Sequence, residues 1–327
     1  MRVLITGSSG FIGRHVVREL ENDHQLFTPS HEELNICNPS YYVEPIGSCG
    51  FPHSIYGPRA IAEYCCDNKV DAIVHLAATC GGIGINKENP GRFIYENLQM
   101  GITVLEAARL AGVPKVVLLG SVCSYPKFTP IPFKEEDIWN GYPEETNAPY
   151  GIAKKTIMEM GKAYHEQYGM DVTNLVPVNM AGEFDNFDES SSHVIPALIK
   201  KFENPELRFK AKYPMVTLWG TGSASREFLY AGDCASAIGI ALETDTGPEP
   251  INLGTGKEIT ILDLAKLIKE VGEYDADIVC ANEGPDGQPR RCLDITRARN
   301  VLHWEPRVSL KETVRRTIEY YRNTTAG

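Results

Sequence analysis

No stretch of this 327-residue sequence approaches the roughly 18 consecutive apolar residues that a membrane-spanning helix needs. No apolar segment with a small-residue cleavage site precedes the first predicted strand, so we expect no secretory leader. Hydrophobic residues make up 43% of the chain, which is ordinary for a globular protein and too high for a disordered one. We therefore expect a soluble protein that neither crosses a membrane nor is secreted.

The nine cysteines include no CxxC pair and no Cys/His spacing typical of a zinc site. Their number is odd and their positions suggest no disulfide framework, which favours reduced thiols in a cytosol. The sequence therefore predicts a cytoplasmic protein without a metal site.

Blocks of lysine and arginine are also missing, and the formal net charge is −11. A chain of this charge repels the nucleic-acid backbone, so we expect no nucleic-acid partner. A small anionic ligand stays open, because a few local donors suffice to bind it.

Strands and helices alternate through the first half of the chain. Residues 1–6 read as a buried strand, residues 7–13 as a glycine turn and residues 14–21 as a helix. The alternation continues through strand 25–28, helix 59–67, strand 72–76, helix 91–111, strand 115–119, helix 149–168 and strand 172–178. This pattern predicts an α/β fold with a Rossmann-like, doubly wound parallel sheet.

A chain of this length usually forms more than one core. Residues 181–227 are less regular, and a strand with a helix at 251–271 precedes an amphipathic helix at 310–321. We expect a dinucleotide-binding domain from residues 1–178 and about 229–255, and a smaller, discontinuous α/β substrate lobe from about 179–228 and 256–327. Residues 38–56, rich in proline and tyrosine, look like an inserted loop whose role is open.

Gly7, Gly10 and Gly13 form a GxxGxxG pattern between the first strand and its helix. Glycines at this junction let backbone amides approach a pyrophosphate at the helix N-terminus. A glycine trio elsewhere would be a simple turn, but this placement predicts dinucleotide binding.

The end of the second strand distinguishes NAD from NADP in such folds. Here it reads Phe27-Thr28-Pro29-Ser30-His31, with neither an acid nor an arginine at the tip, although Glu32 and Glu33 follow. Room for a 2′-phosphate near Ser30 and His31 favours NADP(H), with NAD(H) as the open alternative.

Ser121, Tyr150 and Lys154 form the candidate redox site. Ser121 follows a buried strand, and Tyr150 and Lys154 share one face of the next long helix. An ammonium beside a phenol lowers the phenol's pKa from about 10 toward neutrality, which suits proton transfer. A tyrosine and lysine four residues apart are also common as a surface pair, so the triad depends on all three residues.

Longer motifs extend almost from end to end. They are His75-Leu76-Ala77-Ala78, Gly81-Gly82-Ile83, Phe93-Ile94-Tyr95-Glu96-Asn97, Gly120-Ser121-Val122-Cys123-Ser124-Tyr125-Pro126-Lys127, Ser192-His193-Val194-Ile195-Pro196-Ala197-Leu198, Trp219-Gly220-Thr221-Gly222, Arg226-Glu227-Phe228-Leu229 and Pro285-Asp286-Gly287. With these motifs the chain resembles the extended short-chain dehydrogenase/reductase family, in particular its nucleotide-sugar branch. Each motif alone is weak, and together they are specific.

The resemblance implies an NADPH-dependent epimerase-reductase that converts GDP-4-keto-6-deoxy-D-mannose to GDP-L-fucose. It also implies that Cys123 and His193 are the acid/base pair. Inverting the carbons beside a keto group requires one group to remove a proton and another to return one from the opposite face. From the residues alone, Cys123 would be a small core residue and His193 the start of a helix.

The resemblance also implies the binding residues. At the cofactor it places Gly7, Ser9, Gly10, Phe11, Ile12, Gly13, Ser30, His31, Ala77, Ala78, Tyr150, Lys154, Asn179 and His193. At the GDP-linked 4-keto-6-deoxy sugar it places Ser121, Cys123, Asn179, His193, Lys201, Trp219, Arg226, Asp286 and Arg291. Lys201 stands where the family often has arginine, and Arg291 where it often has lysine. A homodimer is expected through the helix that carries Tyr150 and its neighbour.

Two departures from the family pattern leave the substrate open. Ala181-Gly182-Glu183 replaces the usual tyrosine-glycine-proline, and the segment 38–56 is foreign to it. A GDP-sugar 4-ketoreductase or epimerase that performs part of the reaction, on a colitose-type deoxyhexose or a heptose, is therefore the alternative. A non-catalytic dinucleotide-sensing protein is a distant alternative, because such a protein should lose Tyr150 or Lys154.

Overall fold

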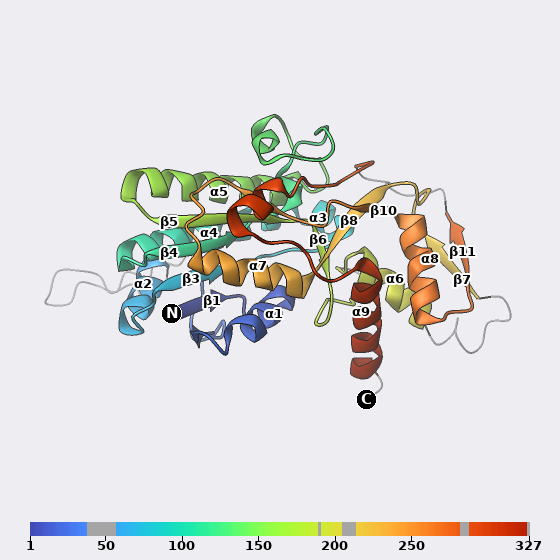
Figure 1. Cartoon of the computed structure of the whole chain (residues 1–327), viewed down its shortest axis with the longest axis horizontal. Coiled ribbons are helices and arrows are strands. Elements are labelled where there is room, and N and C mark those ends of the chain that lie inside the picture. The colour runs from blue at the N-terminus through green and yellow to red at the C-terminus, as the bar shows by residue number, and fades with distance from the viewer. Residues whose placement is uncertain (38–56, 189–190, 205–213, 282–287, 326–327) are drawn as a thin grey trace, which may run out of the picture.

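The computed structural model describes residues 1–37, 57–188, 191–204, 214–281 and 288–325. Its largest sheet is parallel throughout and has the strand order β2-β1-β3-β4-β5-β9 (Figure 1). The strands are β1 (Arg2–Thr6), β2 (Gln25–Phe27), β3 (Ala72–His75), β4 (Lys115–Leu119), β5 (Asp171–Pro177) and β9 (Ile251–Leu253). The predicted doubly wound parallel sheet is confirmed.

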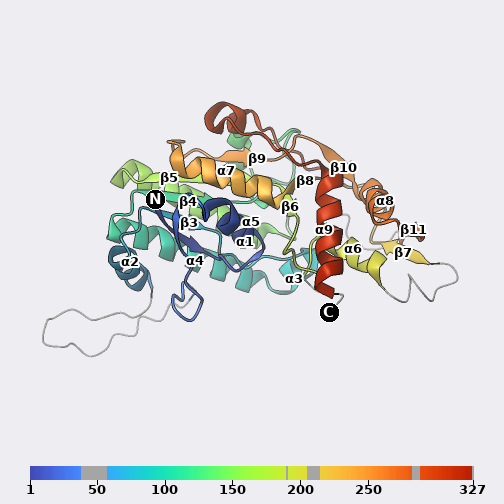
Figure 2. The same cartoon turned by 60° about the horizontal axis from the view of Figure 1, so that its bottom comes forward.

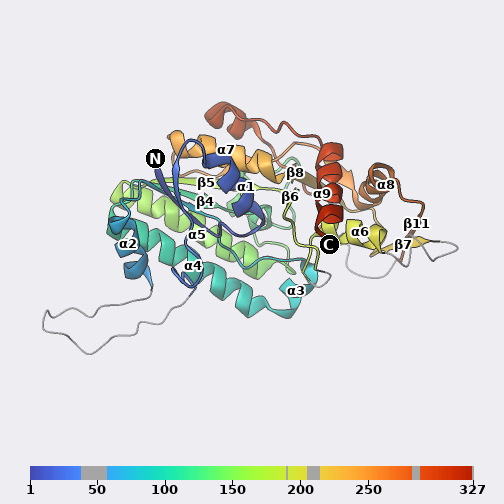
Figure 3. The same cartoon turned by 90° about the horizontal axis from the view of Figure 1, so that it is seen from below.

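Helices cover both faces of this sheet (Figure 3). One face carries α1 (Phe11–Leu20) and α7 (Ala231–Glu243), and the other carries α2 (Pro58–Asp67), α4 (Pro90–Ala111) and α5 (Ala148–Tyr168). Because both faces are covered, the inner strands are apolar on both sides, as β4 with Val116-Val117-Leu118-Leu119 illustrates.

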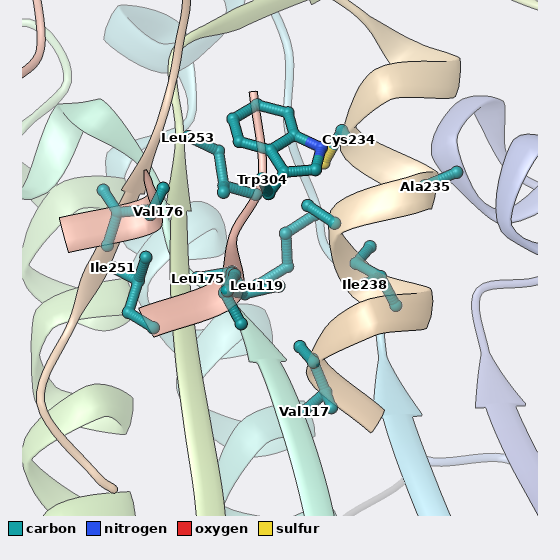
Figure 4. Close-up of a cluster of buried hydrophobic side chains, with 14 of the residues drawn as sticks. Val117, Leu119, Leu175, Val176, Cys234, Ala235, Ile238, Ile251, Leu253 and Trp304 are labelled. Carbon is teal, nitrogen blue, oxygen red and sulfur yellow. The ribbon is translucent and has the colours of Figure 1, made fainter. Parts of the chain in front are cut away.

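The core under α7 contains side chains from distant parts of the sequence (Figure 4). Val117 and Leu175 of the sheet pack there against Ile238 of α7 and Trp304 of a later segment. The Trp304 indole N–H donates to the backbone oxygen of Asp233 at 3.2 Å, so this bulky ring is buried with its polar atom satisfied.

Beside the main sheet, the described residues form two small sheets and a further group of helices (Figures 1 and 2). The strands are β6 (Asn179–Ala181), β8 (Ser225–Tyr230) and β10 (Glu258–Thr260) in one sheet, and β7 (Met215–Leu218) and β11 (Asp277–Cys280) in the other. The helices are α6 (Val194–Glu203), α8 (Ile261–Gly272) and α9 (Leu310–Thr325). Their apolar side chains form a third core of their own.

The predicted division into two domains stays a prediction. One stretch packs differently from the proposed boundary, because Leu293, Ile295 and Trp304 lie in the core of the main sheet. The helix predicted from Arg14 begins at Phe11, and the short helix α3 (Ile83–Glu88) was not predicted. The inserted segment 38–56 lies outside the described residues.

Within the described ranges, no helix is long and apolar enough to cross a membrane. The same ranges contain no group of three or more His, Cys, Asp or Glu side chains that could hold a metal ion. The eight cysteines that the structure describes are free thiols.

Candidate active site

The glycine turn lies at the point where the strand order reverses. The chain runs from β1 outward to β2 and then returns to β3 on the other side of β1, so the carboxyl ends of β1 and β3 lie at the switch point where parallel sheets of this kind bind ligands. A Cβ on Gly7 would lie 2.7 Å from the backbone nitrogen of Ala77, and one on Gly13 would lie 2.1 Å from the Gly7 carbonyl oxygen. Gly7 also has φ of +72°. Only glycines fit here, which matches a backbone cradle for a pyrophosphate.

Helix α1 begins within the glycine turn, so its N-terminus lies at this switch point. Its N-cap is Gly10, with no side-chain cap, and the helix begins at Phe11. The first amides of a helix lack intrahelical acceptors and carry partial positive charge. Ser9, Gly10, Phe11 and Ile12 are therefore placed as the sequence predicts for an anion at the end of β1.

Ser30 and His31 follow β2 and are both exposed. The Ser30 amide donates to the Glu33 carboxylate at 2.7 Å, and the Glu33 amide donates to the Ser30 hydroxyl at 3.2 Å. This reciprocal pair fixes the turn and puts a carboxylate beside the position predicted to hold a 2′-phosphate. The sequence prediction did not consider this effect of Glu33.

The end of β3 is fixed to the end of β1. Thr6 Oγ1 and His75 Nδ1 lie 2.8 Å apart, and the Ala77 amide donates to Thr6 Oγ1 at 3.4 Å. Complete burial lowers the pKa of His75 to about 3, and the nearby Lys154 ammonium acts in the same direction. His75 is therefore neutral, and Thr6, which contacts both His75 and Ala77, holds Ala77 next to the glycine turn.

Ser121 ends β4 and starts a one-turn 3₁₀ helix, Val122–Ser124. Its hydroxyl accepts a hydrogen bond from the Cys123 amide at 3.1 Å, which fixes the position of Cys123 relative to Ser121. A Cβ on Gly151 would lie 2.1 Å from the Cys123 carbonyl oxygen, so the missing side chain lets α5 approach this turn. Gly151 thereby brings Tyr150 next to Ser121 and Cys123.

Lys154 is buried one helical turn after Tyr150, and its ammonium donates to the Leu119 carbonyl oxygen at 2.9 Å. Burial lowers the pKa of Lys154 to about 8, with the Cys80 thiol acting in the opposite direction. The ammonium lies 5.9 Å from the centroid of the Tyr150 ring.

The pKa of Tyr150 is raised well above its ordinary value, so the predicted lowering by Lys154 is wrong. Burial is the main cause, the thiols of Cys80 and Cys123 add to it, and a hydrogen bond with Ser121 opposes it. Burial therefore outweighs the ammonium. Tyr150 is a protonated phenol, which makes it a proton donor.

His193 is the N-cap residue of α6, and part of its surface is open to solvent while neighbouring protein surrounds the rest. The protein packed around it desolvates the ring and lowers its pKa below the ordinary 6.5, so the imidazole is neutral near pH 7. The Gly82 amide donates to the Ser191 backbone oxygen at 3.1 Å, which ties the loop before His193 to the loop after β3.

Cys80 is a site residue that the sequence prediction missed. It lies in the loop after β3, where part of the residue is open to solvent and neighbouring protein surrounds the thiol. The thiol interacts electrostatically with Lys154, Asp185 and Cys123. Desolvation by the surrounding protein raises the pKa of Cys80, whereas the Lys154 ammonium opposes this. Its place two residues after Ala78, in the loop that flanks the glycine turn, was the available signal.

Glu183 connects three elements. Its carbonyl oxygen lies 2.9 Å from Nε2 of His15 on α1, and its carboxylate accepts the Tyr230 hydroxyl of β8 at 2.9 Å. The departure from the family pattern thus forms a structural contact between α1 and β8. Nearby, the Asn179 amide donates to the Glu227 carbonyl oxygen at 3.1 Å.

The residues predicted to bind the GDP-linked sugar come from α6, the smaller sheets and the segment before Leu293. Trp219 is 72% exposed after β7, and the Lys201 ammonium lies 5.5 Å from one of its ring centroids. Arg226 is on β8 and donates to the Ser225 carbonyl oxygen at 2.7 Å. Arg291 is buried and donates to the Cys123 sulfur at 3.6 Å. Asp286 lies outside the described residues.

Known proteins resemble this chain over nearly its whole length. The family model described as "NAD dependent epimerase/dehydratase family" matches residues 3–254. GDP-L-fucose synthase of Escherichia coli (strain K12) is 34% identical over 331 residues, which cover 98% of this chain and 96% of that protein. GDP-L-colitose synthase of Yersinia pseudotuberculosis is 32% identical over 326 residues, which cover 99% of this chain and 98% of that protein. The solved structure of GDP-mannoheptose C4 reductase from Campylobacter jejuni with NADP bound has a TM-score of 0.82 at 25% identity, covering 98% of each chain.

Proposed function

Because this chain belongs to the NAD dependent epimerase/dehydratase family, we propose that it converts GDP-4-keto-6-deoxy-D-mannose to GDP-L-fucose with NADPH. The reaction inverts C3 and C5 of the sugar and reduces C4. The observation that carries the proposal is the meeting of Ser121, Cys123 and Tyr150 at the end of β4, where Gly151 removes the side chain that would separate them. This places a proton donor for reduction beside an acid/base thiol.

The cofactor would be held by the turn from Gly7 to Gly13 and by the N-terminus of α1. The clashes that a Cβ would cause at Gly7 with Ala77 and at Gly13 with Gly7 support this, because only glycines let the turn pack closely against β3 and α1, as in dinucleotide-binding turns. When bound, the cofactor supplies the hydride for C4. Ser30 and His31 are the proposed contacts for a 2′-phosphate, and the NADP named with the Campylobacter structure supports NADP(H) over NAD(H).

For the reduction, Tyr150 gives a proton to the C4 oxygen. Its raised pKa keeps the phenol protonated until the oxygen gains negative charge. Ser121 donates a second hydrogen bond to the same oxygen. Lys154 adds positive charge near the Tyr150 ring.

For the epimerisations, Cys123 and His193 exchange protons with C3 and C5. The C4 keto group acidifies these positions, and the resulting enolate oxygen is the atom that Ser121 and Tyr150 hold during reduction. One set of donors therefore serves both half-reactions. The nucleotide part would lie along Lys201, Trp219 and Arg226, where arginine suits a diphosphate, and Asn179 would lie near the cofactor or the sugar.

The second candidate is a GDP-sugar 4-ketoreductase or epimerase that performs only part of this sequence. It is supported by the names of two similar proteins, the GDP-L-colitose synthase and the GDP-mannoheptose C4 reductase. Glu183, where the family usually has proline, is a departure of this chain from the family pattern that leaves the sugar open. A non-catalytic dinucleotide sensor is the distant candidate, and an unchanged sugar turnover in Tyr150→Phe would support it.

The decisive experiment incubates the protein with GDP-4-keto-6-deoxy-D-mannose in heavy water, once with NADPH and once with NADH. We expect GDP-L-fucose with deuterium at C3 and C5, formed faster with NADPH. Reduction with both original protons retained would contradict the epimerase proposal and support the 4-ketoreductase. Cys123→Ser should lose deuterium uptake while still binding NADPH.

A homodimer is the remaining part of the proposal. On α4, Tyr95, Ile102 and Leu110 are 54%, 42% and 45% exposed, and Tyr168 at the end of α5 is 46% exposed. The two helices lie side by side on the outer face of the molecule (Figure 3). Apolar groups spread along such a face suit a two-fold contact. The expected cytoplasmic location stays a prediction.

A further inference from the structure

Arg291 is a buried guanidinium that pairs with no carboxylate in the part of the chain that the structure describes. Only 7% of the residue is exposed. Its Nε donates to the Gln288 side-chain oxygen at 2.7 Å, and its Nη1 donates to the Cys123 sulfur at 3.6 Å. Both contacts are to uncharged or thiol groups, which is unusual for a buried positive charge.

The neighbouring residue provides a direct contrast. Arg290 is exposed and forms an ion pair with the Glu258 carboxylate. Two consecutive arginines therefore differ in kind: one has an ordinary surface partner, and the other faces a cysteine in the candidate active site. An arginine stays protonated at any working pH, so an anion that forms beside Arg291 would be stabilised by its charge.

The guanidinium is held firmly in this position. Gln288 is 5% exposed, and its amide nitrogen donates to the Lys127 carbonyl oxygen at 2.6 Å. Lys127 lies on the same short stretch as Cys123, whose own amide is fixed by Ser121. The contact between Arg291 and the sulfur is thus fixed from both ends, although the two residues are 168 positions apart.

We propose that Arg291 is the counter-ion of the Cys123 thiolate and acts as a positioning residue for acid/base chemistry at this thiol. The inference rests on the proposed function and deepens it by assigning what holds the charged form of Cys123. A guanidinium is suited to this role because it donates directional hydrogen bonds and cannot itself lose a proton.

The proton balance requires a thiolate in the reaction cycle. If His193 removes the sugar proton, it becomes an imidazolium, the C–H electron pair moves to the enolate, and the Cys123 thiol then protonates that carbon from the opposite face. Sulfur is left as the thiolate. If the roles are reversed, Cys123 begins as the thiolate and accepts the sugar proton. In both orders the negative charge lies on sulfur in one state, beside Arg291.

The test measures alkylation of Cys123 by iodoacetamide, which reacts with the thiolate, at one fixed pH near neutrality and without any sugar. Tryptic peptides 116–127 and 70–87 each contain one cysteine, so Cys80 in the same site serves as an internal standard. In Arg291→Gln the rate at Cys123 relative to Cys80 should fall about tenfold or more, the size expected for losing a charge-assisted hydrogen bond. Arg291→Lys, which keeps the charge, should stay within about threefold of the parent. Arg290→Gln is the matched control and should leave the rate unchanged.

An unchanged relative rate in Arg291→Gln would overturn the proposal, and so would an equal fall at both cysteines. If Arg291→Gln does not fold, Gln288→Ala keeps the charge but releases the guanidinium. It should lower the relative rate several-fold, and no change there would equally overturn the assignment.

A second measurement links the pair to the sugar. With GDP-4-keto-6-deoxy-D-mannose in heavy water, Arg291→Gln should lower the turnover number for deuterium uptake about tenfold or more with little change in NADPH affinity. Because alkylation needs no sugar, a wrong substrate assignment would leave the alkylation result intact. A failure of the thiolate pairing would appear in alkylation whatever the substrate is.

Discussion

Tyr150 stands in the site as a protonated phenol, because burial holds its pKa well above the ordinary value. An acid with a raised pKa keeps its proton until the neighbouring oxygen becomes strongly basic. We therefore expect Tyr150→Phe to lower the rate of C4 reduction by about a hundredfold or more, the usual contribution of a positioned acid. Stopped-flow oxidation of NADPH in a single turnover measures this rate. The exposed Tyr142→Phe is the control, and a rate within twofold of the parent for Tyr150→Phe would remove the phenol from its proposed role.

Asp185 is a second residue whose environment determines its charge. It is 7% exposed, and its Oδ2 has no hydrogen-bond partner within the described ranges. Burial raises the pKa of Asp185 from 3.8 to about 7, with the Asn186 amide opposing this. Between these two values the unfolded chain loses the proton and the folded chain keeps it. This residue's contribution to stability therefore falls as the pH rises from about 4 to 7.

Asp185→Asn removes that titration. The parent loses stability through Asp185 as the pH rises, and the variant does not. We therefore expect the variant to gain about 3 °C or more in melting temperature relative to the parent between pH 4 and pH 7. Differential scanning calorimetry over this range measures the difference. A constant difference across the range would show that Asp185 does not titrate there.

Among the elements, the contact between α5 and the 3₁₀ turn after β4 determines the geometry of the site. A Cβ on Gly151 would lie 2.1 Å from the Cys123 carbonyl oxygen. This oxygen belongs to the backbone, so it cannot move aside as the end of a flexible side chain can. Gly151→Ala should therefore lower sugar turnover at least tenfold through displacement of Tyr150 from Cys123. Gly91→Ala on α4 is the matched control, because nothing lies within 4 Å of its added Cβ. It should leave turnover unchanged, and equal activity of the two variants would contradict the packing argument.

Glu227 links β8 to two distant segments. It is completely buried, and its carboxylate accepts the amides of Gly256, Thr255 and Leu293. Glu227→Gln would turn one acceptor into a donor that faces those amides. We expect a loss of about 3 kcal/mol in the free energy of unfolding, as for other broken buried charge networks. Urea denaturation measures it, and a loss below about 0.5 kcal/mol would show that the carboxylate is not needed.

Local patterns allowed the sequence to predict the main sheet and much of the candidate site. The glycine turn, Ser121 and the Tyr150 helix are each recognisable within a few residues, and parallel topology brings strand ends together. The contacts between Arg291 and Cys123 and between Glu227 and Leu293 join residues 168 and 66 positions apart, so no local pattern indicates them. The pKa direction of Tyr150 was predicted wrongly because burial, which depends on the folded surroundings, outweighs the neighbouring lysine.

The outer face of α4 and α5 is the proposed dimer contact. The two helices cover the main sheet on the side opposite α1 and α7 (Figure 3). Ile102, Leu110 and Tyr168 are exposed on them. Because α5 also carries Tyr150, a two-fold contact there would stiffen the helix that positions the phenol. The proposed dimer would thus couple assembly to the site.

Ile102→Glu tests this coupling by placing a charge at the centre of the proposed contact. The parent should have twice the chain mass in solution and the variant the mass of a single chain, as measured by light scattering after size-exclusion chromatography. Because Ile102 is 42% exposed in the single chain, the charge can stay hydrated in the monomer, so the monomer should remain folded. Trp139→Glu, on another exposed apolar residue, is the control and should stay dimeric. A parent that is already monomeric, or an Ile102→Glu variant that keeps the dimer mass, would contradict the assignment of this face.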